Sequence, residues 1–181
     1  ATGDVNGDGT DDVIVGAGPR GGPRIRVFDG TTITATNPTI IADFFAYESN
    51  FRGGVIVAAG DINGDGFDDI VVGSGVGGGP RVRVFDGTTL TAASVTTIAD
   101  FFAYESNFRG GVNVGVGNFN GDGFDDIIAG AGVGGGPRVR IFDGTAVKVA
   151  QPAALTDYFA YSSDLRSGVT VAAGDLNADS K

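Results

Sequence analysis

Short apolar runs separated by turns rich in glycine and aspartate are the dominant pattern along the chain. In one stretch, an apolar run at 54–60 precedes a polar loop, a second run follows at 69–74, and Arg and Val alternate over 81–86. A fourth run, at 97–104, follows a threonine-rich turn. Short runs and a period of two are typical of β-strands, and no segment has the 3.6-residue period of an amphipathic helix. The sequence predicts a small four-stranded antiparallel sheet.

This pattern recurs every 57 residues without an insertion, which indicates a repeated structural unit. The superposed positions are Asp4, Asp61, Asn118 and Asp175; Asp29, Asp86 and Asp143; and Arg52, Arg109 and Arg166. The predicted repeats span 4–60, 61–117 and 118–174, and 175–181 begins a fourth loop. Because repeated four-stranded sheets are typical of propeller blades, we expect an all-β fold, a β-propeller segment of about three blades within residues 1–181.

Composition and charge add a hint of metal. The 181 residues include 33 glycines and no Trp, Met, Cys or His, and the formal net charge of −10 disfavours nucleic acid or an anionic membrane as a general partner. No apolar run approaches the ~20 residues that span a bilayer. Thirteen of the 22 acidic residues fall in four glycine-rich loops: Asp4, Asp8, Asp11, Asp12, Asp61, Asp65, Asp68, Asp69, Asp122, Asp125, Asp126, Asp175 and Asp179. So many like charges repel unless a cation lies among them.

The loop that starts at Asp61 has the spacing of a calcium site. Oxygen-bearing side chains stand at loop positions 1, 3, 5 and 9, position 6 is a glycine for the sharp turn, and position 7 offers a backbone carbonyl. Calcium prefers six to eight oxygen ligands in such a loop. The expected ligands are Asp4, Asn6, Asp8, Thr10 and Asp12; Asp61, Asn63, Asp65, Phe67 and Asp69; Asn118, Asn120, Asp122, Phe124 and Asp126; and Asp175, Asn177 and Asp179.

Other interpretations of these loops are weaker. An EF-hand needs a glutamate at position 12, where this chain has the apolar Val72. Magnesium prefers a compact octahedron rich in water. Asx-turns without a metal remain an alternative, because Asn-Gly and Asp-Gly are favoured turn dipeptides, but a turn does not need four such residues at fixed spacing.

These motifs resemble the FG-GAP repeat of integrin α-subunit propellers and the related bacterial VCBS-type repeats. Phe51-Arg-Gly-Gly-Val stands at the family's Phe-Gly, GDINGDGFDDIVVGSG matches the calcium loop and the next strand, and RVRVFDG matches the strand after it. The Gly-Ala-Pro element is loosened to GAGPRGGP, GSGVGGGP and GAGVGGGP. The resemblance implies a propeller with calcium between the first two strands of each blade, and ligands on the opposite face. The integrin ligand-binding residues do not carry over.

Two further patterns have a structural interpretation. Paired arginines at Arg24 and Arg26, Arg81 and Arg83, and Arg138 and Arg140 could hold an anionic polysaccharide, but we expect them to bind Asp43, Asp100 and Asp157 or carbonyl groups between blades. Aromatic clusters at Phe44, Phe45, Tyr47 and Phe51, and at Phe101, Phe102, Tyr104 and Phe108, could stack on sugars. We expect them to pack between blades instead.

The sequence favours a non-catalytic, extracellular or cell-surface module that binds a protein or polysaccharide. It has no His or Cys, no serine beside a plausible base, and carboxylates that are assigned to calcium. The alternatives are an architectural segment of a larger surface assembly, an accessory domain of a secreted hydrolase, and an engineered repeat scaffold. The near-identity of two DFFAYESNFRGG segments fits recent duplication or design, and the divergent DYFAYSSDLRSG argues against design.

The two ends of the chain raise the question of closure. We expect 1–10 to begin after the first strand of the first blade, and 168–174 to be a spare copy of that strand. Propellers typically have four to eight blades. Either a homodimer closes a six-bladed ring, or further blades belong to a longer chain.

Overall fold

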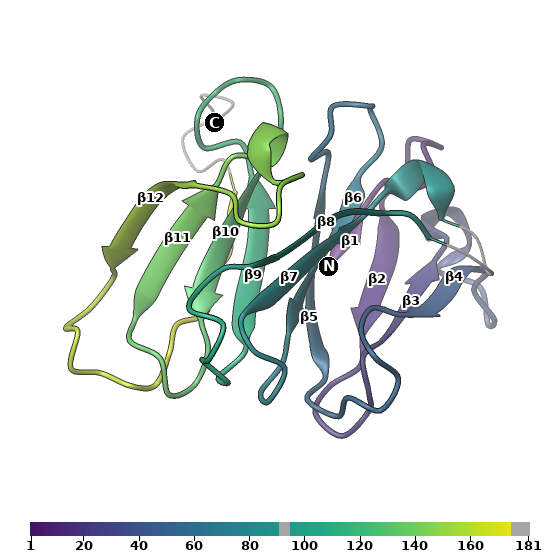
Figure 1. Cartoon of the computed structure of the whole chain (residues 1–181). Helices are drawn as coiled ribbons and strands as arrows, with labels where there is room; N and C mark the ends of the chain where they lie inside the picture. Colours follow the sequence, from purple (N-terminus) through teal and green to yellow (C-terminus); the bar gives the residue numbers. More distant parts are fainter. Residues whose placement is uncertain (91–94, 175–181) are drawn as a thin grey trace.

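The computed structural model describes residues 1–90 and 95–174, which form three four-stranded antiparallel sheets in chain order (Figure 1). The first sheet contains β1 (Thr2–Gly3), β2 (Asp12–Gly16), β3 (Arg24–Phe28) and β4 (Ile40–Phe45). The second contains β5 (Val55–Gly60), β6 (Asp69–Ser74), β7 (Arg81–Phe85) and β8 (Thr97–Phe102). The third contains β9 (Val112–Gly117), β10 (Asp126–Ala131), β11 (Arg138–Phe142) and β12 (Ala154–Phe159). The predicted four-stranded unit is confirmed.

Sheet geometry repeats with the sequence. In each sheet the strands pair in chain order, and the register shifts at the same place, between Val27 and Phe28, Val84 and Phe85, and Ile141 and Phe142. The threonine-rich turn after the third strand contains a short 3₁₀ helix: η1 (Gly30–Thr32), η2 (Gly87–Thr89) and η3 (Gly144–Ala146). An aspartate caps each helix, as Asp86 accepts a hydrogen bond from the Thr88 amide at 2.9 Å.

The first strand of the first sheet is partly present. Thr2 pairs with Val13 and Gly3 with Asp12, and the Ala1 ammonium donates to the Ile14 carbonyl at 3.1 Å. The expectation that 1–10 begins after this strand was therefore wrong. Residues 1–3 superpose on the last half of β5 under the 57-residue shift, a match that three residues were too few to reveal in the sequence.

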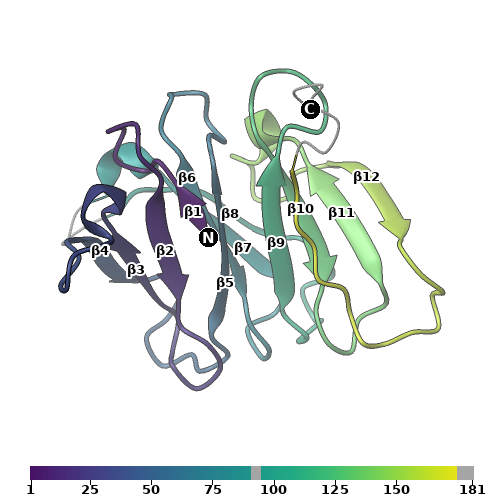
Figure 2. The ribbon, with the colours of Figure 1, turned by 180° about the vertical axis from the view of Figure 1, so that it is seen from behind.

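The segment at 168–174 lies against the third sheet without joining a strand ladder, and Figure 2 shows it running beside β10. The Val169 amide donates to the Ala131 carbonyl at 2.9 Å, just as the Val55 amide at the start of β5 donates to Ala17 at 2.9 Å. Val169, Val171 and Ala173 pack on Ile128, Val139 and Ile141. This segment thus occupies the place that β5 has against the first sheet and carries no sheet of its own among the described residues.

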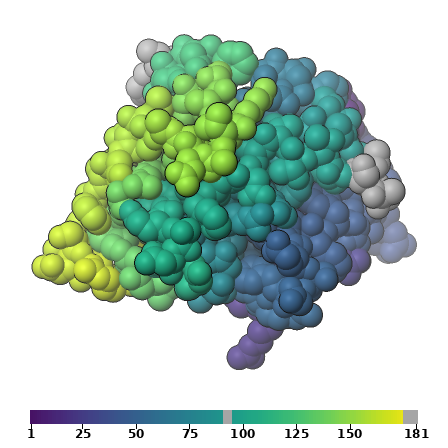
Figure 3. Space-filling view, viewed as in Figure 1, coloured from purple at the N-terminus to yellow at the C-terminus, as the bar shows by residue number. Residues whose placement is uncertain are grey.

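The core lies between successive sheets, which stack into one continuous body (Figure 3). One apolar cluster joins the first sheet to the second, and another joins the second to the third. Every residue of β6 and β10 is buried, because a strand between two neighbouring sheets is covered on both faces. This burial explains why DIVVGS does not alternate. No helix in the described ranges has the length and apolarity needed to cross a membrane.

Each pair of neighbouring sheets is fastened by what we call the tyrosine junction: Tyr47, Glu48, Arg81 and Arg83 in one case, and Tyr104, Glu105, Arg138 and Arg140 in the other. The buried Tyr47 hydroxyl donates to the carbonyls of Val72 at 2.7 Å and Arg81 at 2.9 Å. The Tyr104 hydroxyl donates to Ala129 and Arg138 at the same distances. A buried hydroxyl that satisfies two carbonyls on the next sheet fixes the sheets in one register.

The arginines complete this junction. Arg83 Nη1 donates to the Ala46 carbonyl at 2.6 Å and Arg81 forms an ion pair with Glu48 at 3.2 Å, while both guanidinium groups lie within 6 Å of the Tyr47 ring centre. The carboxylate that binds both arginines is Asp100, which lies on the adjacent strand of the same sheet. The structural interpretation of the paired arginines is confirmed, but the aspartate fork acts within a sheet rather than between sheets.

Aromatic packing between sheets is confirmed for one half of each cluster. Phe44 meets Phe85 edge to face, and Phe101 meets Phe142 in the same way, both with ring centres 5.0 Å apart. Phe45 and Phe102 contradict the expectation, because they are 52% and 43% exposed. Adjacent strand residues point to opposite faces, so only one of each Phe-Phe pair can face the next sheet.

Candidate metal-binding loops

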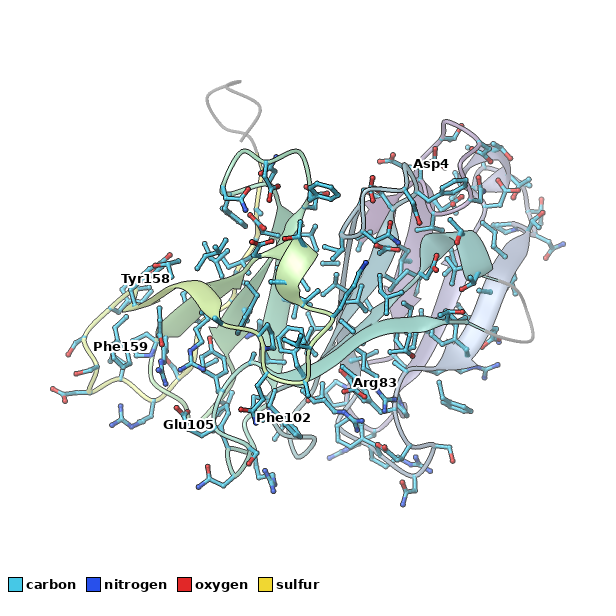
Figure 4. All side chains as sticks on the ribbon, turned by 45° about the horizontal axis from the view of Figure 1, so that its top comes forward. Asp4, Arg83, Phe102, Glu105, Tyr158 and Phe159 are labelled. Carbon is cyan, nitrogen blue, oxygen red and sulfur yellow. The ribbon has the colours of Figure 1, made fainter. Side chains whose placement is uncertain are left out.

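Three acidic loops lie at the same end of the sheets, each between the first and second strand (Figure 1). We number each loop from Asp4, Asp61 or Asn118 as position 1. Figure 4 labels Asp4 at this end, whereas Glu105 and Phe102 lie toward the opposite end. The loops and the tyrosine junctions therefore occupy separate ends of the molecule.

Glycines give these loops their tight turns. Gly64 and Gly66 have φ values of +77° and +87°, in the left-handed region that favours glycine. A Cβ at Gly64 would also collide with the ring of Phe124, whereas a Cβ at Gly66 would meet nothing within 4 Å. Phe124, at position 7 of the third loop, thus packs over the second loop, and Phe67 packs in the same way over Gly7.

The loop carboxylates and amides are turned into the loop by backbone hydrogen bonds. In the second loop, Asp61 accepts from the amides of Gly64, Asp65 and Gly66 at 2.7–3.1 Å. Asn63 accepts from the Asp65 amide at 2.9 Å, and Asp65 accepts from Phe67 at 3.0 Å. The predicted side chains at positions 1, 3 and 5 therefore line one concave turn, and the same bonds would form in a metal-free Asx-turn.

Position 9 supplies a buried carboxylate at the base of each loop. Asp12, Asp69 and Asp126 are 0% exposed. Asp69 accepts from the amides of Ile62 at 3.2 Å and Gly87 at 3.0 Å, so it ties the loop to η2. Burial raises the pKa of Asp69 to about 7, although these two backbone bonds oppose the rise. Burial also raises the pKa of Asp12 and of Asp126. An ionised carboxylate in such a place calls for a neighbouring cation.

The first loop shows how closely these oxygens approach. Carboxylate oxygens of Asp8, Asp12 and Asp29 lie within 4.8 Å of one another. Sequence reasoning placed Asp8 and Asp12 there but missed Asp29, which also caps η1. Its recurrence as Asp86 and Asp143 at the 57-residue period was the signal that could have found it. An all-oxygen set of carboxylates, amides and carbonyls fits a hard cation such as calcium.

The third loop is less acidic at its first position. Asn118 accepts a hydrogen bond from the Gly121 amide at 2.7 Å, as Asp61 does from Gly64. Asp122 accepts from the Asn120 side chain at 3.0 Å. The position-7 residues Thr10, Phe67 and Phe124 offer only their carbonyl oxygens. Asp175, Asn177 and Asp179, predicted to begin a fourth loop, lie outside the described residues.

Comparison with known families gives one result. The FG-GAP-like repeat family matches this chain at residues 4–72 and again at 61–129. The chain belongs to the FG-GAP-like repeat family. Each matched segment begins at position 1 of an acidic loop and ends within the second strand of the following sheet, so an FG-GAP-like repeat contains one junction between sheets. No curated protein matches the chain.

Proposed function

We propose that this FG-GAP-like chain is a calcium-binding β-propeller module that acts outside the cell as a non-catalytic binding domain. Its three sheets are the blades, and its three described loops hold calcium through the residues at positions 1, 3, 5, 7 and 9. The observation that carries the proposal is the buried carboxylate at position 9 of every loop, 0% exposed and facing other acidic side chains.

A cation resolves an electrostatic conflict in these loops. Asp69 and Asp65 raise each other's cost of ionisation, and Asp86 adds to it. Backbone amides stabilise the Asp69 carboxylate but do not neutralise it. Calcium bound among these oxygens would supply the missing positive charge, and its preference for six to eight oxygen ligands suits a loop that offers five positions and Asp86 nearby.

The same chemistry favours an extracellular location. Loops with few ligand charges bind calcium at ~10⁻⁴–10⁻³ M in extracellular modules, a range that cytosolic calcium does not fill. The formal net charge of −10 also keeps such a module away from anionic surfaces. A protein or polysaccharide ligand is the proposed partner, and catalysis is not proposed because the chain has no His or Cys to act as base or nucleophile.

Calorimetric titration of the 181-residue chain with calcium chloride tests the metal. We expect saturable binding that magnesium chloride does not reproduce, and roughly tenfold weaker binding at one site in Asp65→Asn, which removes one ligand charge. Asp11→Asn is the matched control, because this exposed aspartate stands at position 8 and is not a proposed ligand. Absence of calcium binding, or equal effects of the two variants, would contradict the proposal.

A further inference from the structure

The two outer faces of the array carry the unmatched halves of a tyrosine junction. On the first sheet, the side chains of Arg24 and Arg26 are 47% and 44% exposed, whereas the equivalent Arg81 and Arg83 are 25% and 21% exposed. On the third unit, Tyr161 is 67% exposed, whereas the equivalent Tyr47 and Tyr104 are buried. One face therefore has the arginines without the tyrosine, and the other has the tyrosine without the arginines.

The apolar parts of the same junction are exposed too. Val15 on β2 is 46% exposed, although its equivalent Val72 is fully buried beneath the neighbouring sheet. Tyr158 on β12 is 46% exposed, although its equivalent Phe101 is 2% exposed against Phe142. Figure 4 shows Tyr158 on the outer strand of the third sheet, at the edge of the molecule.

We propose that a second copy of this chain docks head to tail, with the third sheet of one copy against the first sheet of the other. The internal junctions, shifted by 57 residues, give the contacts. The Tyr161 hydroxyl donates to the carbonyls of Val15 and Arg24 of the second copy, and Arg26 of the second copy donates to the Ala160 carbonyl. Tyr158 meets Phe28 of the second copy edge to face, as Phe44 meets Phe85.

A second copy is the occupant because both halves belong to the same chain. The internal interface occurs twice in each copy with the same hydrogen bonds, so it is a surface that this sequence already satisfies. Head-to-tail contacts form a closed ring when rotation brings the last face to the first. Two copies related by a twofold axis use both faces of each and give six sheets, within the usual range for propellers.

The edge of β2 adds a strand contact to this interface. Ala1 to Gly3 lie beside Asp12 to Ile14, and no described strand lies beside residues 15–17 on that edge. Residues 169–171 of the second copy correspond in repeat position to the missing partner. Residues 172–174 share their repeat position with residues 1–3 of the second copy, so one of these two segments is displaced on assembly.

One junction residue is changed at the outer face. Glu48 and Glu105 form ion pairs with Arg81 and Arg138, but the equivalent position carries Ser162. The proposed interface thus retains the tyrosine bonds and loses this one ion pair. That substitution offers a way to strengthen the contact.

Sedimentation equilibrium of the 181-residue chain in calcium buffer tests the proposal. We expect a dimer of twice 18.2 kDa at micromolar concentration. Tyr161→Ala should weaken dimerisation by about tenfold or more, as for an interface aromatic anchor. The matched control is Phe159→Ala, because Phe45 and Phe102 at the same repeat position stay exposed beside the internal junctions. Both side chains are exposed in the single chain, so circular dichroism should show an intact fold in each variant.

A gain of affinity gives a second readout. Ser162→Glu should tighten the dimer about two- to fivefold, the range for a part-exposed ion pair, and should lose that gain in high salt. Ser163→Glu adds the same charge one residue away and should not tighten it. A monomeric chain, or a dimer indifferent to Tyr161→Ala, would overturn the proposal and assign the outer faces to further blades of a longer chain. The proposal rests on the blade arrangement proposed above but not on calcium, whose absence the calorimetric titration detects separately.

Discussion

Asp4 and Asp68 join two neighbouring loops through reciprocal hydrogen bonds. The Asp4 amide donates to Asp68 Oδ2 at 3.0 Å, and the Asp68 amide donates to the Asp4 carbonyl at 3.0 Å. Asp61 and Asp125 repeat the arrangement at 3.1 and 3.0 Å. Position 1 of one loop is therefore held by position 8 of the next, so the candidate metal loops form a connected row.

The carboxyl oxygen of Asp68 should matter for stability more than its charge. Asp68→Ala leaves the part-buried Asp4 amide without its acceptor and should lower the free energy of unfolding by about 1–2 kcal/mol. Asp68→Asn retains an acceptor oxygen and removes a carboxylate whose pKa burial raises, so it should be tolerated. Urea unfolding measures both, and Asp11→Ala, exposed at position 8 of the first loop, is the control. Equal losses in the alanine and asparagine variants would refute this account.

Calcium should stabilise the whole array. A ligand present at 100 times its dissociation constant adds ~2.7 kcal/mol for each site. Melting curves in about 10 mM calcium should therefore lie well above curves in EDTA, given affinities of ~10⁻⁴ M. Magnesium at the same ionic strength controls for screening of the acidic surface. Superimposable curves in calcium and EDTA would argue against bound metal in the loops.

The third loop should bind calcium most weakly. It has Asn118 where the other two have Asp4 and Asp61, so it offers two ligand carboxylates among positions 1 to 9 where the others offer three. Affinity rises with ligand charge, so Asn118→Asp should tighten one site in a calorimetric titration. An unchanged isotherm would show that position 1 does not hold the ion.

Two glycines in one loop should respond differently to alanine. Both Gly64 and Gly66 have positive φ, so each substitution strains the backbone by about 1 kcal/mol. Gly64→Ala also forces the Phe124 ring away, whereas Gly66→Ala meets open space. Thermal unfolding should show the larger loss in Gly64→Ala. A difference that persists when Phe124 is replaced by alanine would mean that ring packing is not its source.

The arginine forks should stabilise the fold only above acid pH. Burial acts to raise the pKa of Asp100, but the hydrogen bonds from Arg81 and Arg83 outweigh it and lower that pKa. A carboxylate with a lowered pKa in the folded state contributes stability above its unfolded pKa and loses it as pH falls through the folded value. Asp100→Asn should therefore cost about 1–2 kcal/mol at pH 6.

The test is urea unfolding of wild type and Asp100→Asn across the acid range. The difference between them should be constant above about pH 5 and should shrink below about pH 4, where the wild-type carboxylate takes up a proton. A difference independent of pH would mean that Asp100 acts through packing rather than charge.

Local features of this fold were largely predictable from the sequence. Strand alternation in 81–86 and apolar runs such as 69–74 identified the sheets, because a strand covered on both faces loses its polar positions while one covered on a single face keeps them. The spacing of Asp61, Asn63 and Asp65 identified the loop, because the sharp turns at its glycines leave few other arrangements.

Relationships between sheets were harder to foresee. The pairing of Tyr47 with Val72 and Arg81 depends on how two separate sheets stack, and no spacing within one repeat encodes it. For the same reason, Asp100 was expected between blades but binds within its own sheet. The approach of Asp29 to Asp8 and Asp12 depends on the fold of the third-strand turn, which sequence reasoning treated as a separate element.

The uniform 57-residue spacing of the junctions makes the units interchangeable along the chain. Tyr47 meets Arg81 and Arg83 through the same atoms with which Tyr104 meets Arg138 and Arg140. An in-frame loss of 57 residues between them would present Arg138 and Arg140 to Tyr47, and a duplication would insert one more identical joint. Array length can therefore change by recombination at the level of the gene, without any new contact having to evolve.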